Sequence, residues 1–337
     1  MWLISVCLLA CGLVSGQTPR IAVIDFYGLG KTPESALRTA LGVKEGEALP
    51  RSKAEVEARL QQVGGVTLAR LQAVCCEAGG AVLFVGIEEK GAPHFDLRPS
   101  PASAVELPQE VLDAYQAFLE ARDAAARSGE SREDLTRGYA LSADPAVRAS
   151  QERFTGLATS NFGALRDVLR NSGVAEQRIM AAYVIGYAAD RKTAVDELLY
   201  ALQDPDDGVR HNAIRALTAL AVYAAKNPEP ALRIPPTWVV EMLHSIFWDD
   251  RTRAVNLLLT LTESRDPGAL DLIRERGSVQ LIEMARWRSL AYALPAFVLL
   301  GRTAGLTDEQ IQDFWSRGER DAVIAKAGAR NGAATVR

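Results

Sequence analysis

A helical pattern of hydrophobic and polar positions is clearest between residues 204 and 220, in the segment DPDDGVRHNAIRALTAL. Its apolar residues recur at spacings of three and four, which places them on one stripe of an α-helix. Asp204 is predicted to cap this helix, Pro205 to occupy its first position, and Asp207 to favour the positive end of the helix dipole. The stripe consists of Val209, Ala213, Ala216, Leu217 and Leu220. Its small residues predict close packing against a neighbouring helix.

Weaker copies of this pattern lie on both sides of it. Arg148, Arg178 and Arg210 stand at equivalent points, separated by 30 and 32 residues, which is a period expected for stacked helix pairs. The residues that define the repeat are Asp204, Pro205, Val209, Arg210, Ala213 and Leu217 in one copy and Arg178, Ala181 and Ile185 in the copy before it. The pattern resembles HEAT repeats, and this resemblance implies an all-α, armadillo-like solenoid over residues 141–325. In such repeats Asp and Arg cap helices and link neighbouring repeats, so we prefer a structural role for them to a catalytic one.

The later repeats are less regular. A proline-rich insertion occupies residues 227–236, after which the pattern restarts with Arg253 at the arginine position and Asn256 where a buried alanine is expected. A capping box at residues 307–310 predicts a last helix. In all, four to five helix pairs are expected, and residues 326–337 are predicted to form a flexible tail.

A different pattern precedes the repeats. Alternating or continuous apolar runs predict strands at residues 21–27, 66–77 and 81–88, and helical spacing with capping residues predicts helices at 32–41 and 52–63. The glycines between the last two strands favour a hairpin. The predicted fold class is therefore an α+β module of β-α-α-β-β order over residues 20–91, followed by the all-α solenoid.

This module resembles a POTRA domain, a small module of outer-membrane protein-assembly and two-partner-secretion transporters. The resemblance rests on IDFYGLG, LGVKEGEAL, the helix-ending Gly64-Gly65 and VLFVGIEE. It implies that a partner polypeptide is bound by addition of a strand to the sheet edge. The GLGK segment at residues 28–31 lacks the spacing of a nucleotide motif, so we interpret Gly28, Gly46 and Gly86 as turn and close-packing residues.

The two predicted modules are separated by residues 92–107, which are rich in proline and poor in apolar residues and are therefore expected to form an extended linker. Residues 108–140 are predicted to form helices that lead into the repeats, with a turn at Ser128-Gly129. The first of these helices is amphipathic, with an apolar side at Val111, Leu112, Tyr115, Phe118 and Leu119. Its acidic polar side favours docking on the repeats over binding to a membrane surface.

Residues 1–16 have the apolar core and small-residue ending of a signal peptide. They predict a mature chain that starts at Gln17, has no transmembrane segment, and is exported to the periplasm or cell envelope. The segment Leu8-Leu9-Ala10-Cys11 resembles a bacterial lipobox, so a lipid anchor at Cys11 is an alternative. A buried N-terminal strand or helix is a third interpretation.

Composition and charge narrow the functional classes. The net charge is −4 over 337 residues, without a basic block, so nucleic acid is not an expected partner. His94, His211 and His244 lie in separate segments, which predicts neither a metal site nor a cofactor, and His211 is expected at the surface. Cys75 and Cys76 are expected to be two thiols, because adjacent side chains of a strand point to opposite faces.

The chain carries none of the common serine-hydrolase, zinc-protease or phosphate-loop motifs. We therefore favour a non-enzymatic scaffold of the bacterial cell envelope that binds a protein or peptide partner through the sheet edge and the solenoid surface. The alternative is a HEAT-type lyase or chaperone that acts on a cofactor-bearing protein, similar to bilin lyases. The tryptophans at 238, 248 and 287 are expected mainly in the core, with aromatic anchoring of a peptide as the other interpretation.

Overall fold

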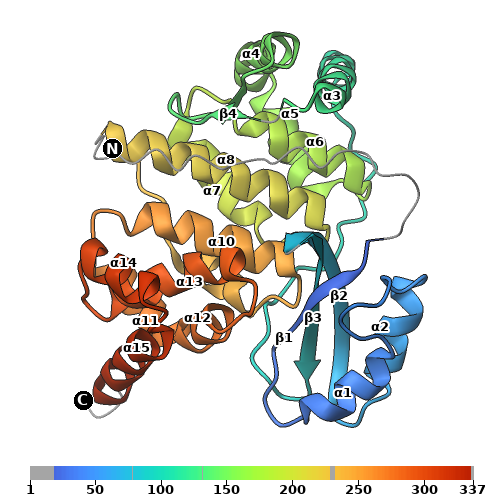
Figure 1. Ribbon diagram of the computed structural model, residues 1–337. Helices are drawn as coiled ribbons and strands as arrows, with labels where there is room; N and C mark the ends of the chain where they lie inside the picture. Colours follow the sequence, from blue (N-terminus) through green and yellow to red (C-terminus); the bar gives the residue numbers. More distant parts are fainter. Residues whose placement is uncertain (1–18, 78, 131, 228–231, 335–337) are drawn as a thin grey trace.

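The structure is a computed structural model that describes residues 19–77, 79–130, 132–227 and 232–334. The signal peptide and the lipid anchor predicted for residues 1–16 lie outside these ranges. Figure 1 shows a small sheet with two helices at one end of the chain and a succession of helices that makes up the rest. The predicted fold class, an N-terminal α+β module followed by an all-α repeat region, is confirmed.

The N-terminal module contains a three-stranded sheet with the strand order β1-β3-β2. Its elements are β1 (Ile21–Tyr27), α1 (Glu34–Leu41), α2 (Lys53–Gln61), β2 (Val66–Glu77) and β3 (Gly80–Glu89). β3 pairs in parallel with β1 and antiparallel with β2. The antiparallel strands are consecutive in the chain, as the predicted hairpin requires, whereas the parallel pair requires the crossover through α1 and α2.

Side chains alternate between the two faces of this sheet, and both faces are covered. Ile24, Leu83 and Val85 pack in one hydrophobic cluster with Leu37 of α1 and Leu60 of α2. The opposite face belongs to a second cluster, which is continuous with the core of the repeats and includes Val23, Tyr27, Val82 and Phe84. The sheet is therefore sandwiched between its own helices and the repeats.

The segment after β3 is not a free spacer. Its backbone is hydrogen-bonded to the ends of the repeat helices: Arg98 N donates to Gln203 O at 2.8 Å, and Ser103 N donates to Asn171 O at 3.0 Å. Phe95 and Leu107 are buried. The expected linker at 92–107 is extended, but it runs along the helices as a fixed strap.

The predicted amphipathic helix is α3 (Gln109–Ser128), which ends at Gly129 in a left-handed conformation, as the turn prediction requires. A short hairpin of β4 (Glu133–Asp134) and β5 (Leu141–Ser142) then leads into the repeats. The helices that follow are α4 (Pro145–Ser160), α5 (Phe162–Asn171), α6 (Ala175–Ile185), α7 (Arg191–Ala201), α8 (Asp207–Lys226), α9 (Thr237–Glu241), the 3-10 helix η1 (Met242–His244), α10 (Trp248–Leu261), α11 (Pro267–Arg276), α12 (Ser278–Ala285), α13 (Leu290–Thr303), α14 (Asp308–Ser316) and α15 (Arg320–Ala334). Among them, α4, α6, α8 and α10 pack side by side in that order.

Each of these four helices begins with the same local unit, in which an arginine donates to the carbonyl oxygen six residues before it. The bonds are Arg148 Nε to Ser142 O at 2.9 Å, Arg178 Nη1 to Ser172 O at 2.9 Å, Arg210 Nη1 to Asp204 O at 2.9 Å and Arg251 Nε to Ser245 O at 2.6 Å. The side chain of the earlier Ser or Asp accepts the backbone N–H two residues further on. The repeat signature is therefore Ser/Asp-x5-Arg, which sets the angle at which the chain enters each helix.

This unit corrects the predicted register of the fourth repeat. The equivalent arginine is Arg251 rather than Arg253, so the fully buried Ala254 takes the alanine position at which Asn256 was expected. The prediction slipped by two residues because the proline-rich insertion lengthens the preceding repeat and removes the constant spacing.

The cap of α8 also differs from the prediction. Asp206, not Asp204, accepts the N–H of Val209 at the helix start. Asp204 lies one step earlier, where its carboxylate accepts the N–H of Asp206 and pairs with Arg178. Pro205 consequently precedes the cap instead of occupying the first helical position.

The C-terminal end is more ordered than expected. The capping box of Thr307 and Gln310 at the start of α14 is confirmed. The tail predicted from residue 326 is wrong for the described residues, because α15 continues to Ala334 and buries Val323, Ile324 and Ala327. Helix α13 continues through Pro295.

The sulfur atoms of the adjacent residues Cys75 and Cys76 lie against each other in β2. The expectation that they are two thiols stays a prediction. Within the described part of the chain, none of the helices combines the length and the apolar character that a membrane crossing needs.

Candidate functional site at the junction of sheet and repeats

The sheet meets the repeats through a cluster of aromatic rings. The ring of Phe84 lies 4.7 Å from that of Trp287 and 5.2 Å from that of Trp248, and Tyr292 lies 5.1 Å from Trp248. Trp248 and Trp287 are buried as expected, whereas the side chain of Trp238 is 39% exposed. Aromatic pairs of this kind stabilise a protein beyond the burial of their apolar area, so the junction forms part of the hydrophobic core.

A buried hydrogen bond at the centre of this junction joins the end of β1 to the segment before α10. The hydroxyl of Tyr27 donates to the carbonyl oxygen of Ile246 at 2.6 Å. Gly86 lies directly beneath, and a Cβ atom there would come within 2.5 Å of the Tyr27 hydroxyl and 2.7 Å of the Ile246 oxygen. Gly86 is therefore a close-packing residue, as the sequence indicates.

Carboxylates of the N-terminal module form hydrogen bonds and an ion pair with the residues just before α13. Asp25 accepts the backbone N–H groups of Arg288, at 3.0 and 3.1 Å to its two oxygens, and of Ser289 at 3.3 Å. Burial raises the pKa of the Asp25 carboxyl, and these two N–H groups offset part of that increase. Glu45 forms an ion pair with the guanidinium of Arg288, and Glu77 accepts the Ser289 hydroxyl at 2.7 Å.

Glu283 of α12 bridges three segments. Its Oε1 accepts the N–H of Gly28 at 2.5 Å, and its Oε2 accepts a hydrogen bond from Arg251 Nη1 at 2.8 Å. The Arg251 guanidinium in turn lies over the Tyr27 ring, 4.7 Å from its centroid. One carboxylate thus ties the loop after β1 to both α10 and α12.

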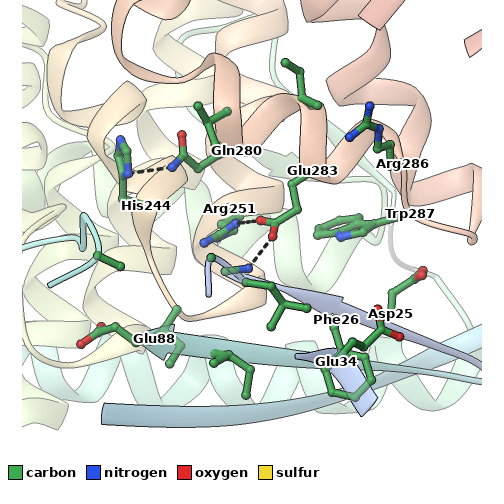
Figure 2. Close-up of a pocket in the computed structure, with 18 of the residues that line it drawn as sticks. Asp25, Phe26, Glu34, Glu88, His244, Arg251, Gln280, Glu283, Arg286 and Trp287 are labelled. Carbon is green, nitrogen blue, oxygen red and sulfur yellow. Dashed lines mark hydrogen bonds and ion pairs between the residues drawn. The ribbon is translucent and has the colours of Figure 1, made fainter. Parts of the chain in front are cut away.

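These contacts border an open cavity of about 790 Å³, which we call the junction groove. Figure 2 shows His244, Gln280, Glu283 and Trp287 along one side of it and Phe26, Glu34 and Glu88 along the other. Pockets of this size at the boundary between two modules are common binding sites.

The polar side of the junction groove is organised by His244. Its Nε2 lies 2.9 Å from the carbonyl oxygen of Arg276, which can only accept, so Nε2 carries the proton. Nδ1 then accepts from Gln280 Nε2 at 3.0 Å. Burial lowers the pKa of His244, which agrees with this neutral tautomer.

The backbone N–H groups of the glycine-rich loop after β1 bind a carboxylate of the protein itself, that of Glu89. Glu89 accepts the backbone N–H groups of Gly30, Lys31 and Thr32 at 2.7 to 2.9 Å. Burial raises the pKa of Glu89, but these hydrogen bonds outweigh it and lower the pKa to about 2. The anion-binding N–H groups of this loop are therefore already satisfied, which agrees with the prediction that it is no nucleotide site.

The repeat residues singled out from sequence lie away from the junction groove, in the helix core. Arg178 pairs with Asp204 at 2.8 Å and Arg210 with Asp250 at 3.0 Å, and all four side chains are buried. Val209, Ala213, Leu217, Ala181 and Ile185 are fully buried, and Pro205 is half-buried. Their positions are those of structural residues that link one repeat to the next.

His211 is half-buried instead of lying at the surface. It lines a small cavity of about 130 Å³ with Trp248 and Asp249 of α10 and with residues of β2 and α2. Burial lowers its pKa. In the described residues no cluster of three or more His, Cys, Asp or Glu side chains could hold a metal ion.

Several backbone groups at the two edges of the sheet are hydrogen-bonded to other groups of the protein. Along β1, Ile21 exchanges backbone hydrogen bonds with Gly46 and Glu47, and Glu45 accepts the N–H of Ile24. Along β2, the Leu71 N–H is taken by Glu57, the Ala69 oxygen by Arg70 and the Cys75 oxygen by Tyr292. Such covering is how proteins prevent pairing with another strand.

Sequence reasoning missed Asp25, Tyr27 and Glu283 as junction residues. A signal for a second covered face was present in β3, which is apolar at almost every position from Ala81 to Ile87. A strand that is apolar on both faces is buried on both faces.

A family model for HEAT repeats matches residues 163–234, which run from α5 to the segment after α8. No curated protein matches the chain. HEAT repeats generally serve as protein-interaction scaffolds, so the match indicates an interaction role for this region.

Proposed function

We propose that the chain is a non-enzymatic scaffold of the bacterial cell envelope that binds another polypeptide. The observation that carries the proposal is the HEAT-repeat match together with the regular stacking of α4, α6, α8 and α10. Stacked helical repeats expose extended surfaces to partners. The envelope location rests on the signal-like pattern of residues 1–16 and on the POTRA-like order of the N-terminal module, with Cys11 as the alternative lipid anchor.

The coverage of the sheet edges changes the expected route of binding. Along β2, the N–H of Leu71 and the carbonyl oxygens of Ala69 and Cys75 are already hydrogen-bonded within the protein, which interrupts the edge for strand addition. A scaffold role that uses the repeats and their junction with the sheet is better supported than one that uses the sheet edge. The two modules also act as one body, because their shared core includes Phe84, Trp248 and Trp287.

The test uses the full chain, because fragments divided at the strap would expose that shared core. The protein is immobilised and incubated with envelope extract, and retained polypeptides are identified by mass spectrometry after washing with salt. An unrelated helical-repeat protein of similar net charge serves as the control bait. We expect a polypeptide retained in stoichiometric amount by this chain alone. Retention of none, together with turnover of a small molecule, would replace the scaffold with an enzyme.

Localisation is tested separately by N-terminal sequencing and intact mass of the native protein. We expect a chain that starts at Gln17, or a lipid-modified chain that starts at Cys11. An intact Met1 in the cytosol would remove the envelope part of the proposal and leave the interaction role.

A further inference from the structure

We propose that Cys75 and Cys76, here called the cysteine pair, form a redox-responsive site. A small organic disulfide oxidises the two thiols reversibly to a disulfide, and the oxidation state affects the contact between β2 and α13. The inference goes beyond the proposed function and does not rest on it.

Both side chains of the cysteine pair are exposed to solvent. They lie in the last part of β2, which is an edge strand because the strand order is β1-β3-β2. Thiols buried in apolar surroundings are inert, whereas a small disulfide can reach the sulfur atoms of this pair without any opening of the core.

The backbone at the cysteine pair departs from a regular strand. Cys75 lies opposite Ala81 and Glu77 lies opposite Gly80, so the register shifts between them and Cys76 is an extra residue without a partner on β3. An extra residue of this kind is a β-bulge, which interrupts the alternation of side chains between the two faces. In agreement with this, the two sulfur atoms lie against each other. The thiols can therefore be joined while the rest of β2 stays paired with β3.

The oxidation is a thiol–disulfide exchange in two steps. The thiolate of one cysteine attacks a sulfur of the small disulfide, which forms a mixed disulfide and releases one small thiolate. The thiolate of the other cysteine then attacks the protein sulfur of the mixed disulfide and releases the second small thiolate. The cysteine pair loses two electrons, the small disulfide gains them, and the two thiol protons pass to the released thiolates. An excess of the small thiol reverses both steps.

The residues beside the cysteine pair favour a slow equilibrium over fast catalysis. The pair is flanked in the sequence by Val74 and Glu77, and a carboxylate does not stabilise a thiolate as a neighbouring cation does. Catalytic cysteines lie in electropositive surroundings instead. The cysteine pair is therefore a site whose oxidation state follows the concentrations of thiol and disulfide around it.

Two hydrogen bonds connect the end of β2 to the start of α13. The Tyr292 hydroxyl donates to the Cys75 carbonyl oxygen at 3.2 Å, and the Ser289 hydroxyl donates to Glu77 at 2.7 Å. The Cys75 carbonyl belongs to the peptide group that a disulfide within the pair encloses in a ring, so closure of the ring restricts the direction of this oxygen. The hydrogen bond from Tyr292 is present while the sulfur atoms are together, so it should favour the disulfide. By the same coupling, oxidation should strengthen the contact of β2 with α13.

The first test measures the oxidation state of the cysteine pair in the full chain. The protein is equilibrated at different ratios of reduced to oxidised glutathione and precipitated with acid, free thiols are alkylated with N-ethylmaleimide, and the chain is digested with trypsin. Cleavage after Arg70 and Lys90 releases peptide 71–90, in which Cys75 and Cys76 are the only cysteines. By mass spectrometry we expect this peptide to change reversibly from a doubly alkylated form to an internal disulfide without attached glutathione. The control Cys76→Ser should form only a mixed disulfide with glutathione.

The second test measures the coupling to α13. Tyr292→Phe keeps the aromatic ring and removes the hydroxyl that bonds to Cys75. It should lower the equilibrium constant for oxidation by glutathione at least about twofold. The matched control is Tyr139→Phe, which removes a hydroxyl from a ring that packs on Tyr187 in the repeats. It should change the constant less than about 1.5-fold.

A doubly alkylated peptide at every glutathione ratio, or a final oxidised form that keeps glutathione, would overturn the redox site. An equilibrium constant that is the same in Tyr292→Phe and in the wild type would overturn the effect on α13. Neither result bears on retention of a polypeptide in the extract experiment, so the proposed function is tested separately.

Discussion

Removal of one hydroxyl group, by Tyr27→Phe, should measurably destabilise the whole protein. The substitution keeps the aromatic ring, its packing against Trp287 at 6.0 Å and its contact with the Arg251 guanidinium. It removes the 2.6 Å hydrogen bond to the Ile246 carbonyl, which lies in a buried environment. Because the carbonyl then loses its donor, we expect a loss of about 1–3 kcal/mol in the free energy of unfolding.

The assay is equilibrium unfolding in urea, followed by tryptophan fluorescence and far-ultraviolet circular dichroism. Trp248 and Trp287 report the junction, whereas the dichroism signal reports mainly the helices of the repeats. Since the sheet and the repeats share a core, the two signals should change together in the wild type, and Tyr27→Phe should lower both midpoints equally.

The matched control is Tyr139→Phe, since the hydroxyl of Tyr139 has no hydrogen bond to another described residue. We expect a change within about 0.5 kcal/mol for this variant. An unchanged midpoint for Tyr27→Phe would show that its hydrogen bond does not stabilise the junction. Separate fluorescence and dichroism transitions in the wild type would refute the single cooperative body.

Three further predictions concern stability and use the same unfolding assay. Glu89→Gln should lower the free energy of unfolding by up to about 3 kcal/mol near pH 7, because the loop at 30–32 lowers the pKa of Glu89 from 4.5 to about 2. The difference from wild type should persist above pH 5 and disappear as the pH falls towards 2. A difference that does not change with pH would contradict this. Ala213→Phe should cost about 1–3 kcal/mol by overpacking α8, and an unchanged midpoint would mean that Ala213 faces solvent. Asp250→Ala should lower the free energy of unfolding by about 3–5 kcal/mol, because Arg210 stays buried without its partner. The double variant Asp250→Leu, Arg210→Met removes both charges and should lose much less. Equal losses for the two variants would show that the ion pair itself is the stabilising element.

Local patterns were sufficient for most elements of the fold. Helix starts with a good capping sequence, such as Thr307 with Gln310, are specified by hydrogen bonds within a few residues, and the structure forms them. The same holds for the left-handed end of α3 at Gly129. The helix cap was predicted wrongly where two neighbouring residues could each serve as the cap. The sequence alone allows either Asp204 or Asp206 to cap α8.

The amino-acid sequence by itself determined the β-α-α-β-β order, the helical repeats and the extended, proline-rich character of residues 92–107, because these follow from periodicity and turn chemistry along a short stretch of chain. Only the tertiary structure decided that the second face of the sheet packs on α10, α12 and α13, that Glu283 joins three segments, and that the junction groove exists. The sheet residues of these contacts are more than 200 positions from their partners in the repeats, as Tyr27 is from Ile246 and Gly28 from Glu283. Their pairing depends on complementary shape and on the satisfaction of buried polar groups, and neither property leaves a spacing pattern in the sequence.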